Sequence, residues 1–314
     1  MTTVAIQNKG LNSLSGIFCA GLVLYHPDSE HYIASIYILL SHGIEVIVFD
    51  NSEDKIAKEH NQAVLQKTFA ERVYYFDAAA GNIGLSAAYN RIADIVKQKN
   101  IAKGLFLFDQ DTDVNETALL HLIESFHILQ DHGQLGLVAG YPKRSNGIPY
   151  RIRPRPSFQS NKPGIIAVDW APSSFSLIPV TTLKTVGGFQ EDFFIDHIDL
   201  DFCLRCWLHN LPVFIDTRAS FLHRVGLGDV MIRNRPLFPI ATPFRHYYQT
   251  RNRILSDTRA QVPLFKTIAM TAQRVVIAIV IGIYAGQLCK RLKYCLYGIV
   301  DGVMGRGGRI SNAR

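Results

Sequence analysis

Acidic residues at alternate positions follow an apolar stretch near the middle of the chain. Residues 105–108 read LFLF, and the run 109–113 reads DQDTD. Carboxylates this close together repel one another unless a cation lies between them, and hard oxygen ligands at this spacing suit Mg²⁺ or Mn²⁺. The alternative is an acidic turn that caps the next helix, with Asp113 or Asn115 as the cap.

Polar residues also follow two other apolar stretches, at positions from which they can contact a ligand bound beside the acidic run. Asp50 follows the run 44–49, at the position where a strand-end carboxylate contacts the ribose or base of a nucleoside. The run 81–90 reads GNIGLSAAYN, and its glycines let the backbone approach a ligand closely. Asn82 offers amide hydrogen bonds to the ligand, although Asn82 or Ser86 could instead cap a helix. The fingerprints of dinucleotide-binding and P-loop proteins do not occur.

Three acids, Asp196, Asp199 and Asp201, lie at the expected start of a helix in the second half of the chain. Acids there interact favourably with the helix dipole, which would be a sufficient role for Asp196 and Asp201. One carboxylate that faces a cleft could act as a general base. Further along, His223 and Arg224 follow a strand. A neutral imidazole could complete the coordination of a metal, and the arginine could face phosphate.

Strands and helices alternate over the first 140 residues. This part of the chain carries most of the candidate side chains. Short apolar runs predict strands at 17–24, 44–49, 73–76, 105–108 and 135–139, and helices are predicted at 29–41, 54–69, 85–99 and 116–130. Single helices between strands imply a mainly parallel sheet with helices on both faces, whose ligands bind at the carboxyl ends of the strands. After an irregular proline-rich loop at 141–163, we predict that regular structure resumes at 165–170, followed by a helix at 199–209 and a strand at 213–215.

The last part of the chain differs in charge from the rest. The net charge of +7 arises entirely after residue 243, because residues 244–314 contain twelve lysines and arginines but only Asp257 and Asp301 as acids. The uncharged run 275–286 is shorter than the roughly 20 residues of a membrane span. Apolar residues flanked by bases predict a helix at the interface of an anionic membrane. The alternative is a helix packed on the preceding domain or on a second subunit, so an oligomer is possible. Nucleic acid is excluded as a partner, because the bases flank aliphatic runs.

The start of the chain and the cysteines indicate a reducing compartment. Residues 1–15 are polar and lack the features of a signal peptide, so we expect a disordered N-terminus and a cytosolic protein. The five cysteines are too few and too scattered for a disulfide framework. Cys203 and Cys206 form a CxxC without a second metal-binding pair, and we expect both to be buried on a helix.

Together these segments resemble the family-two glycosyltransferases with a GT-A fold, most closely the bacterial rhamnosyltransferases of O-antigen and surface-polysaccharide assembly. The resemblance covers residues 17–258 and rests on the order and spacing of the segments 21–25, 48–52, 82–90, 107–111, 187–189, 194–205, 223–226 and 248–252. It implies an α/β GT-A catalytic domain at 16–243, with a nucleotide half at 16–140 and an acceptor half at 164–243. A basic and apolar helical tail follows at 244–314.

The resemblance also implies a role for each candidate site residue. The donor nucleotide sugar would be bound by Tyr25, Asp50, Asn82, Gly84, Asp109 and Arg224. The Mg²⁺ or Mn²⁺ would be bound by Asp111 and His223. The catalytic base would be Asp199, with Asp196 and Asp201 as supporting residues. Asp199 takes the place of the second acid in the family's EDxD pattern. The chain departs from that pattern at Ile198, where the family has glutamate.

The implied reaction is the transfer of a sugar with inversion of its anomeric configuration. The resemblance favours dTDP-rhamnose as the donor, with a UDP-hexose as the alternative. It favours a polyprenyl-diphosphate-linked glycan as the acceptor, at the cytoplasmic face of the bacterial inner membrane. A nucleotidyltransferase and a non-catalytic scaffold of a glycan-assembly complex are competing hypotheses. We expect the donor site to lie wholly upstream of the tail, so that truncation before Pro263 leaves nucleotide binding intact.

Overall fold

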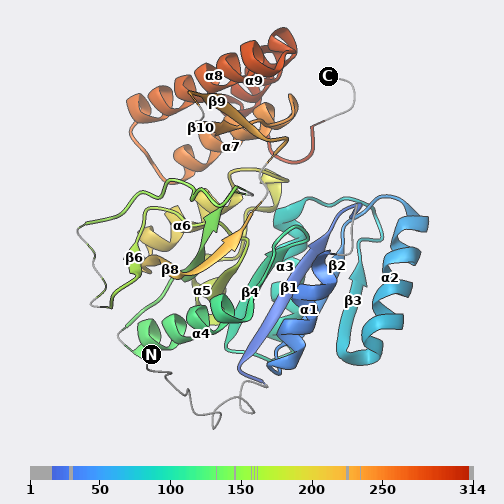
Figure 1. The fold of residues 1–314 in the computed structure, drawn as a ribbon. Coiled ribbons are helices and arrows are strands. Elements are labelled where there is room, and N and C mark those ends of the chain that lie inside the picture. The colour runs from blue at the N-terminus through green and yellow to red at the C-terminus, as the bar shows by residue number, and fades with distance from the viewer. Residues whose placement is uncertain are drawn as a thin grey trace.

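An eight-stranded sheet forms the centre of the molecule (Figure 1). The computed structural model describes residues 16–27, 31–131, 133–144, 146–156, 158, 160, 162–223, 226–233 and 235–310. The strands are β1 (Phe18–Leu24), β2 (Glu45–Asp50), β3 (Val73–Asp77), β4 (Gly104–Asp109), β5 (Leu137–Lys143), β6 (Ile165–Ala167), β7 (Ser176–Pro179) and β8 (Val213–Leu222). Their order in the sheet is β3-β2-β1-β4-β7-β5-β8-β6.

The sheet is mainly parallel, as the sequence predicts. The exceptions are β7, which runs antiparallel to both β4 and β5, and β6, which runs antiparallel to β8. The apolar run that forms β7 is not among the predicted strands. Its insertion between β4 and β5 keeps those two strands in the same direction, so their carboxyl ends reach the same edge of the sheet.

Helices cover both faces of the sheet because its central strands are apolar on both sides. In β1, Phe18, Ala20, Leu22 and Leu24 enter one buried cluster, and Cys19 and Val23 enter the other. The first cluster includes residues of α1 (His31–Ser41), α2 (Lys55–Phe69) and α4 (Glu116–Asp131). The second includes residues of α3 (Leu85–Lys99), α5 (Val180–Val186) and α6 (Ile198–Leu208). Cys203 and Cys206 are buried in the second cluster, as predicted.

Strand β8 is longer than the predicted strand 213–215 and extends to Leu222. Its register against β5 shifts after Gly140, which pairs with Asp216, whereas Tyr141 pairs with Ser220. The far end of β8 stays in the sheet, and the backbone of His223 donates to the carbonyl of Lys143 at 2.8 Å. The extension therefore carries His223 to the carboxyl end of the sheet.

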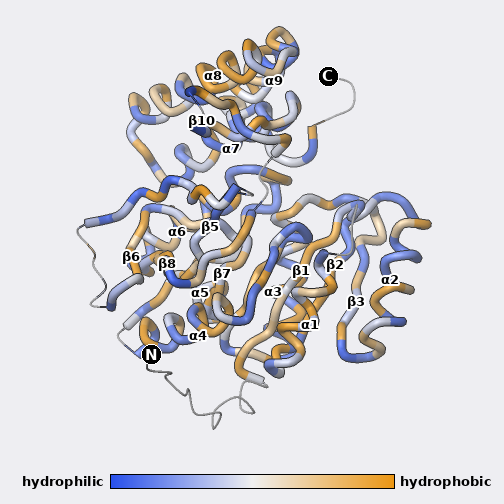
Figure 2. The backbone as a smooth tube through the Cα atoms, in the orientation of Figure 1, coloured by the Kyte–Doolittle hydropathy of each residue, from blue (hydrophilic) through white to orange (hydrophobic). Residues whose placement is uncertain are grey.

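Three helices and a hairpin follow the sheet. The hairpin consists of β9 (Asp229–Ile232) and β10 (Arg235–Pro239), and the helices are α7 (Arg245–Arg259), α8 (Leu264–Ala285) and α9 (Leu288–Val303). Figure 2 shows hydrophobic residues along much of α8. By length and composition α8 is long enough to cross a membrane, and only 22% of its most apolar window is buried. The helix is thus longer than the uncharged run 275–286 suggested.

Helix α7 holds the loop that precedes α6. Arg251 is fully buried and donates to the carbonyl oxygens of Asp192 and Phe193 at 2.9 and 3.0 Å. The amide nitrogen of its neighbour Asn252 lies 2.8 to 3.0 Å from the carbonyl oxygens of Phe193, Ile195 and Asp196. We call residues 192–197 the α6 loop. Helix α7 fixes the backbone of this loop, and the loop in turn positions the acids at the start of α6.

Candidate active site

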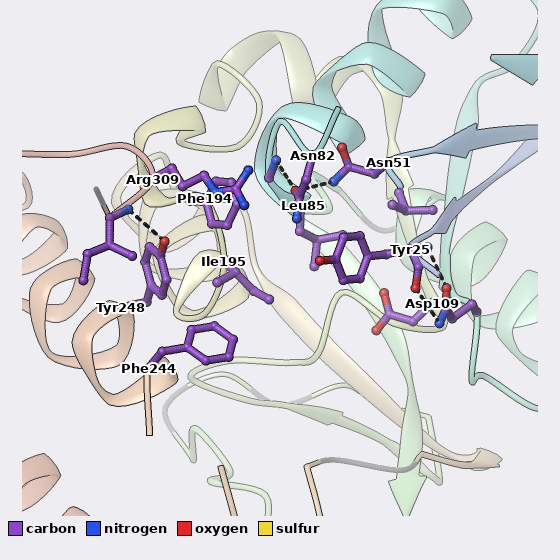
Figure 3. A pocket seen from close by; sticks show the side chains of 14 residues that line it. Tyr25, Asn51, Asn82, Leu85, Asp109, Phe194, Ile195, Phe244, Tyr248 and Arg309 are labelled. Atoms are coloured by element: carbon purple, nitrogen blue, oxygen red, sulfur yellow. Dashed lines mark hydrogen bonds between the residues drawn. The ribbon is translucent and has the colours of Figure 1, made fainter. Parts of the chain in front are cut away.

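A cavity of about 360 Å³ opens at the carboxyl ends of the parallel strands (Figure 3). Its volume lies within the range of small-molecule sites. The first half of the chain contributes Val23, Tyr25, Asn51, Asn82, Gly84, Leu85, Asp109 and Gln110 to its lining, and the second half contributes Phe194, Ile195, Phe244, Tyr248, Arg309 and Ile310. We call this cavity the strand-end pocket. Of the predicted donor-binding residues, it brings together Tyr25, Asn82, Gly84 and Asp109.

Two asparagines shape one wall of the strand-end pocket. The Asn51 amide donates to Asn82 Oδ1 at 3.0 Å and accepts from the backbone of Ile83 at 2.9 Å. Gly84 is left-handed at φ 90°, and a side chain there would collide with Phe194. Helix α3 begins after Gly84 without a side-chain cap, so neither Asn82 nor Ser86 is the cap that the sequence allowed.

Asp50 does not line this pocket, contrary to its predicted contact with the nucleoside. Its side chain is fully buried, and one carboxylate oxygen accepts from Asn61 and Tyr75 at 2.7 and 3.0 Å. The other accepts from the backbone of Ser52 at 2.9 Å. The carboxylate therefore holds β2, α2 and β3 together, and the next residue, Asn51, faces the pocket instead.

Asp109, Asp111 and His223 converge beside the pocket, and one ligand atom from each lies within 4.8 Å of the other two. Asp109 ends β4, Asp111 lies in the turn after it, and His223 follows the extended β8. The hydroxyl of Tyr89 donates to Asp109 Oδ1 at 2.6 Å and orients that carboxylate. The buried His223 Nδ1 has no hydrogen-bond partner among the described residues.

This group fits a divalent cation. Two carboxylates and a neutral imidazole are suitable ligands for Mn²⁺ or Mg²⁺, and a cation there would relieve the repulsion between the acids. The sequence assigned Asp111 and His223 to the metal and placed Asp109 on the ribose or phosphate side, whereas the structure brings all three together. Arg224, the predicted phosphate ligand, lies outside the described residues.

Asp199 is held at the first turn of α6, where one carboxylate oxygen accepts from the backbone of Leu200 at 2.9 Å. Its side chain keeps part of its surface accessible. Burial, together with the negative charges of Asp196 and Asp109, raises the pKa of Asp199 to about 6, although the hydrogen bond from the Leu200 backbone acts in the opposite direction. A carboxyl group with this pKa is ionised near neutral pH and can take a proton from a hydroxyl group.

Asp196 and Asp201 are engaged in ion pairs. Asp196 forms a two-point pair with Arg245, at 2.9 and 2.7 Å. Asp201 is buried and accepts from Arg205 and Ser256, both at 2.7 Å. Asp196 thereby links the α6 loop to α7, and Asp201 links α6 to α7.

Part of the strand-end pocket comes from residues that sequence reasoning did not assign to it. Phe244, Tyr248, Arg309 and Ile310 line it, although the donor site was expected to lie wholly upstream of residue 244. That expectation does not fit the structure, because α7 and residues 308–310 are built into the pocket wall. The segment 248–252 carried a signal for α7, since it matched the family pattern. The sequence held no comparable signal for Arg309.

Sequence comparisons support the resemblance, although no family model matches the chain. The dTDP-rhamnosyl transferase RfbF of Shigella flexneri is 24% identical over 306 residues, which are 92% of this chain and 97% of the relative. The low-salt glycan biosynthesis hexosyltransferase Agl10 of Haloferax volcanii is 20% identical over 317 residues, which are 98% of this chain and 96% of the relative. The chain therefore aligns over nearly its whole length with proteins named as sugar transferases.

Solved structures show the same fold. GalNAc-T7 with UDP, GalNAc and Mn²⁺ aligns with a TM-score of 0.58 at 11% identity, over 77% of this chain and 47% of its own. The chain thus spans about half the length of that protein. The mannosyltransferase PcManGT of Pyrobaculum calidifontis, with GDP-Man and Mn²⁺, aligns with a TM-score of 0.54 at 8% identity, over 91% of this chain and 86% of its own.

Fold and sequence together define the class of protein. The chain has the GT-A fold of nucleotide-sugar glycosyltransferases and resembles such enzymes in sequence. Within that class it resembles the rhamnosyltransferases, through a relative of 24% identity.

We predict that Asp111→Ala weakens Mn²⁺ binding by at least about tenfold, or 1.4 kcal/mol, because the cation loses an anionic ligand. Electron paramagnetic resonance of free and bound Mn²⁺ measures this without any substrate. Asp113→Ala removes a neighbouring acid from outside the cluster and serves as the matched control. Equal Mn²⁺ affinity in Asp111→Ala and wild type would rule the site out.

We also predict that kcat/KM rises with pH through about 6, because Asp199 must lose its proton to act as a base. Asp199→Asn is expected to abolish this limb and to lower kcat by about 10²–10⁴. pH–rate profiles of both proteins, with melting temperatures as a check on folding, test this. An acid limb that persists in Asp199→Asn would assign the titration to another group.

Proposed function

We propose that this protein is a metal-dependent, inverting glycosyltransferase that uses a nucleotide-sugar donor. The observation that carries the proposal is the convergence of Asp109, Asp111 and His223 beside a pocket at the strand ends. The solved neighbours contain nucleotides or nucleotide sugars together with Mn²⁺ on the same fold. The donor's nucleoside would lie against Tyr25, Asn51 and Asn82, and its diphosphate would extend from the acidic cluster across the strand-end pocket.

In the proposed mechanism, Asp199 removes the proton from an acceptor hydroxyl as the oxygen attacks the anomeric carbon. The nucleoside diphosphate leaves from the opposite face in the same displacement, so the anomeric configuration inverts. When bound at Asp109, Asp111 and His223, a divalent cation would neutralise charge on the leaving diphosphate. Tyr89 keeps Asp109 oriented, and the pair between Asp196 and Arg245 keeps the α6 loop in place.

The proposed donor is dTDP-rhamnose. This finer assignment is supported by the similarity to the rhamnosyl transferase at 24% identity. A UDP-hexose is the alternative donor. A non-catalytic scaffold is disfavoured, because the described residues retain both the acidic cluster and an Asp199 with a raised pKa.

The proposed acceptor is a polyprenyl-diphosphate-linked glycan of O-antigen or a related surface polysaccharide. An apolar groove of about 630 Å³ between α7, α8 and α9 offers space for an isoprenoid chain, and Ile254, Ile268 and Ile299 are among its lining residues. The enzyme would then work in the bacterial cytosol, at the cytoplasmic face of the inner membrane. The same groove could alternatively hold a second subunit.

We propose that α8 lies on the membrane surface and does not span the membrane. Leu264, Phe265 and Ile268 are 60 to 73% exposed along its first turns. Burial lowers the pKa of Arg274, near the middle of the helix, while the negative charges of Asp196 and Asp199 act in the opposite direction. That turn of α8 therefore lies within electrostatic reach of Asp196 and Asp199, which disfavours full insertion.

A thermal-shift series with nucleotide sugars and Mn²⁺ tests the donor. We expect dTDP-rhamnose to raise the melting temperature most, since a ligand at 100 times its Kd adds about 2.7 kcal/mol of stability. UDP-glucose and GDP-mannose are the comparison ligands. A larger shift with a UDP-hexose would reassign the donor within the class, and no shift with any nucleotide sugar would count against the class.

Vesicle cosedimentation tests the membrane proposal. Wild-type protein should bind vesicles that contain phosphatidylglycerol and be partly released by salt, since each surface base contributes about 1 kcal/mol. Substituting both Phe265→Glu and Ile268→Glu should abolish binding. Ile56→Glu, at an equally exposed site on α2, should not. Retention of wild-type protein through a carbonate wash would instead indicate insertion.

A further inference from the structure

Residues 304–310, which follow α9, turn back to the strand-end pocket. We call this segment the strap. The backbone of Gly308 donates to the carbonyl of Asp192 and accepts from the buried Arg251, both at 2.5 Å. The backbone of Ile310 donates to the hydroxyl of Tyr248 at 3.0 Å (Figure 3). These bonds attach the strap to both the α6 loop and α7, on the side of the pocket opposite Asp109.

The path of the strap depends on a close approach of its backbone to Asp192. A side chain at Gly307 would collide with the carboxylate of Asp192, so only glycine permits the contact. Gly308 is left-handed, at φ 85°, which glycine adopts without strain. The strap is therefore a defined part of the pocket wall, and it fixes the position of the following residue, Arg309.

Arg309 places a guanidinium at the mouth of the pocket. It lies over the ring of Phe194, 5.6 Å from the ring centre, and donates to Glu53 Oε1 at 3.2 Å. Its side chain remains 52% exposed. Glu53 also contacts His26 Nε2 at 3.0 Å, so it keeps a partner if Arg309 turns away. The ion pair is thus one that an anionic ligand can exchange.

The charges of the residues that line the pocket suit this guanidinium to bind an anionic ligand. Among the described residues that line the cavity, Arg309 alone carries a positive charge, and Asp109 alone carries a negative one. A nucleoside diphosphate brings further negative charge into this space. A divalent cation at the acidic cluster would offset part of it, and planar guanidinium groups are suited to bind phosphate oxygens at two points.

We infer that Arg309 is a donor-binding residue that exchanges Glu53 for the diphosphate of the nucleotide sugar. The inference rests on the proposed function. It gives the strap a direct part in substrate binding, and the ligands that the strap would bind are nucleoside diphosphates. The guanidinium lies over the ring of Phe194, and that ring stacks with Tyr248 at 5.5 Å between ring centres.

Isothermal titration in the presence of Mn²⁺, with dTDP, UDP and the nucleoside thymidine, tests the inference. Arg309→Gln should weaken dTDP and UDP binding by about tenfold or more, the effect expected from losing a hydrogen bond between charged groups. Thymidine affinity and the melting temperature should be unchanged. Arg309→Lys should retain part of the diphosphate affinity, because its charge remains.

Arg306→Gln is the matched control, because it lies on the same strap but pairs with Asp301 at 3.5 Å. It should leave the affinity for all three ligands unchanged. Wild-type affinity for dTDP and UDP in Arg309→Gln would overturn the inference, as would an equal loss for thymidine, which would indicate a structural effect of the strap. Failure of the wild-type protein to bind either diphosphate would instead overturn the proposed function.

Discussion

The guanidinium of Arg251 is fully buried, and the α6 loop, α7 and the strap meet around it. It makes five hydrogen bonds, to Asn252, the hydroxyl of Tyr247 and the carbonyls of Asp192, Phe193 and Gly308. Burying a cation costs several kcal/mol unless its donors are satisfied. Here the compensation comes from neutral oxygens and from the faces of two tyrosine rings at 5.0 Å. The α6 loop, α7 and the strap must all be present to provide it.

This arrangement stabilises a strained backbone next to the proposed base. Phe194, Asp196 and His197 have φ values of 63 to 65°, in the left-handed region that side chains disfavour. Each such residue costs of the order of 1–3 kcal/mol, and such strain persists only where the surroundings hold it. Asn252 provides that support through three carbonyl contacts. In this conformation the carbonyl of Phe194 accepts a hydrogen bond from the backbone of Leu85, at the start of α3, at 2.6 Å.

The local pattern of apolar residues was sufficient to predict the strands in the first half of the fold. Short branched and aromatic runs predicted β1 to β5 to within a few residues, because β1, β2 and β4 are buried on both faces and the edge strand β3 is still rich in aromatic residues. The pattern did not predict β7, and it ended β8 too early, because polar residues at 216–218 interrupt the apolar run. Asp216 is nevertheless buried, where it bonds with Ser125 and Arg218. Ser125 lies 91 positions from Asp216, and β8 continues to Leu222 through its pairing with β5.

The candidate site was predictable to the extent that its residues follow predicted strands. Asp109, Asp111 and Asn82 lie at such ends, and the structure brings them to one edge of the sheet. Asp50 met the same criterion, but Asn61 and Tyr75 engage its carboxylate inside the core. No periodicity identifies such partners in advance. Arg309 lies 256 positions from its partner Glu53, and nothing in its neighbours in the sequence indicates that contact.

The strap also sets an order of events during synthesis. Strands β1 to β4, with the pocket-lining residues Tyr25, Asn51 and Asn82, leave the ribosome long before residues 308–310 do. Since the opposite wall includes Arg309 and Ile310, the complete pocket cannot exist on a partly made chain. A nascent chain would therefore gain little stability from nucleotide sugar until residues 308–310 have been made and have folded onto the α6 loop and α7.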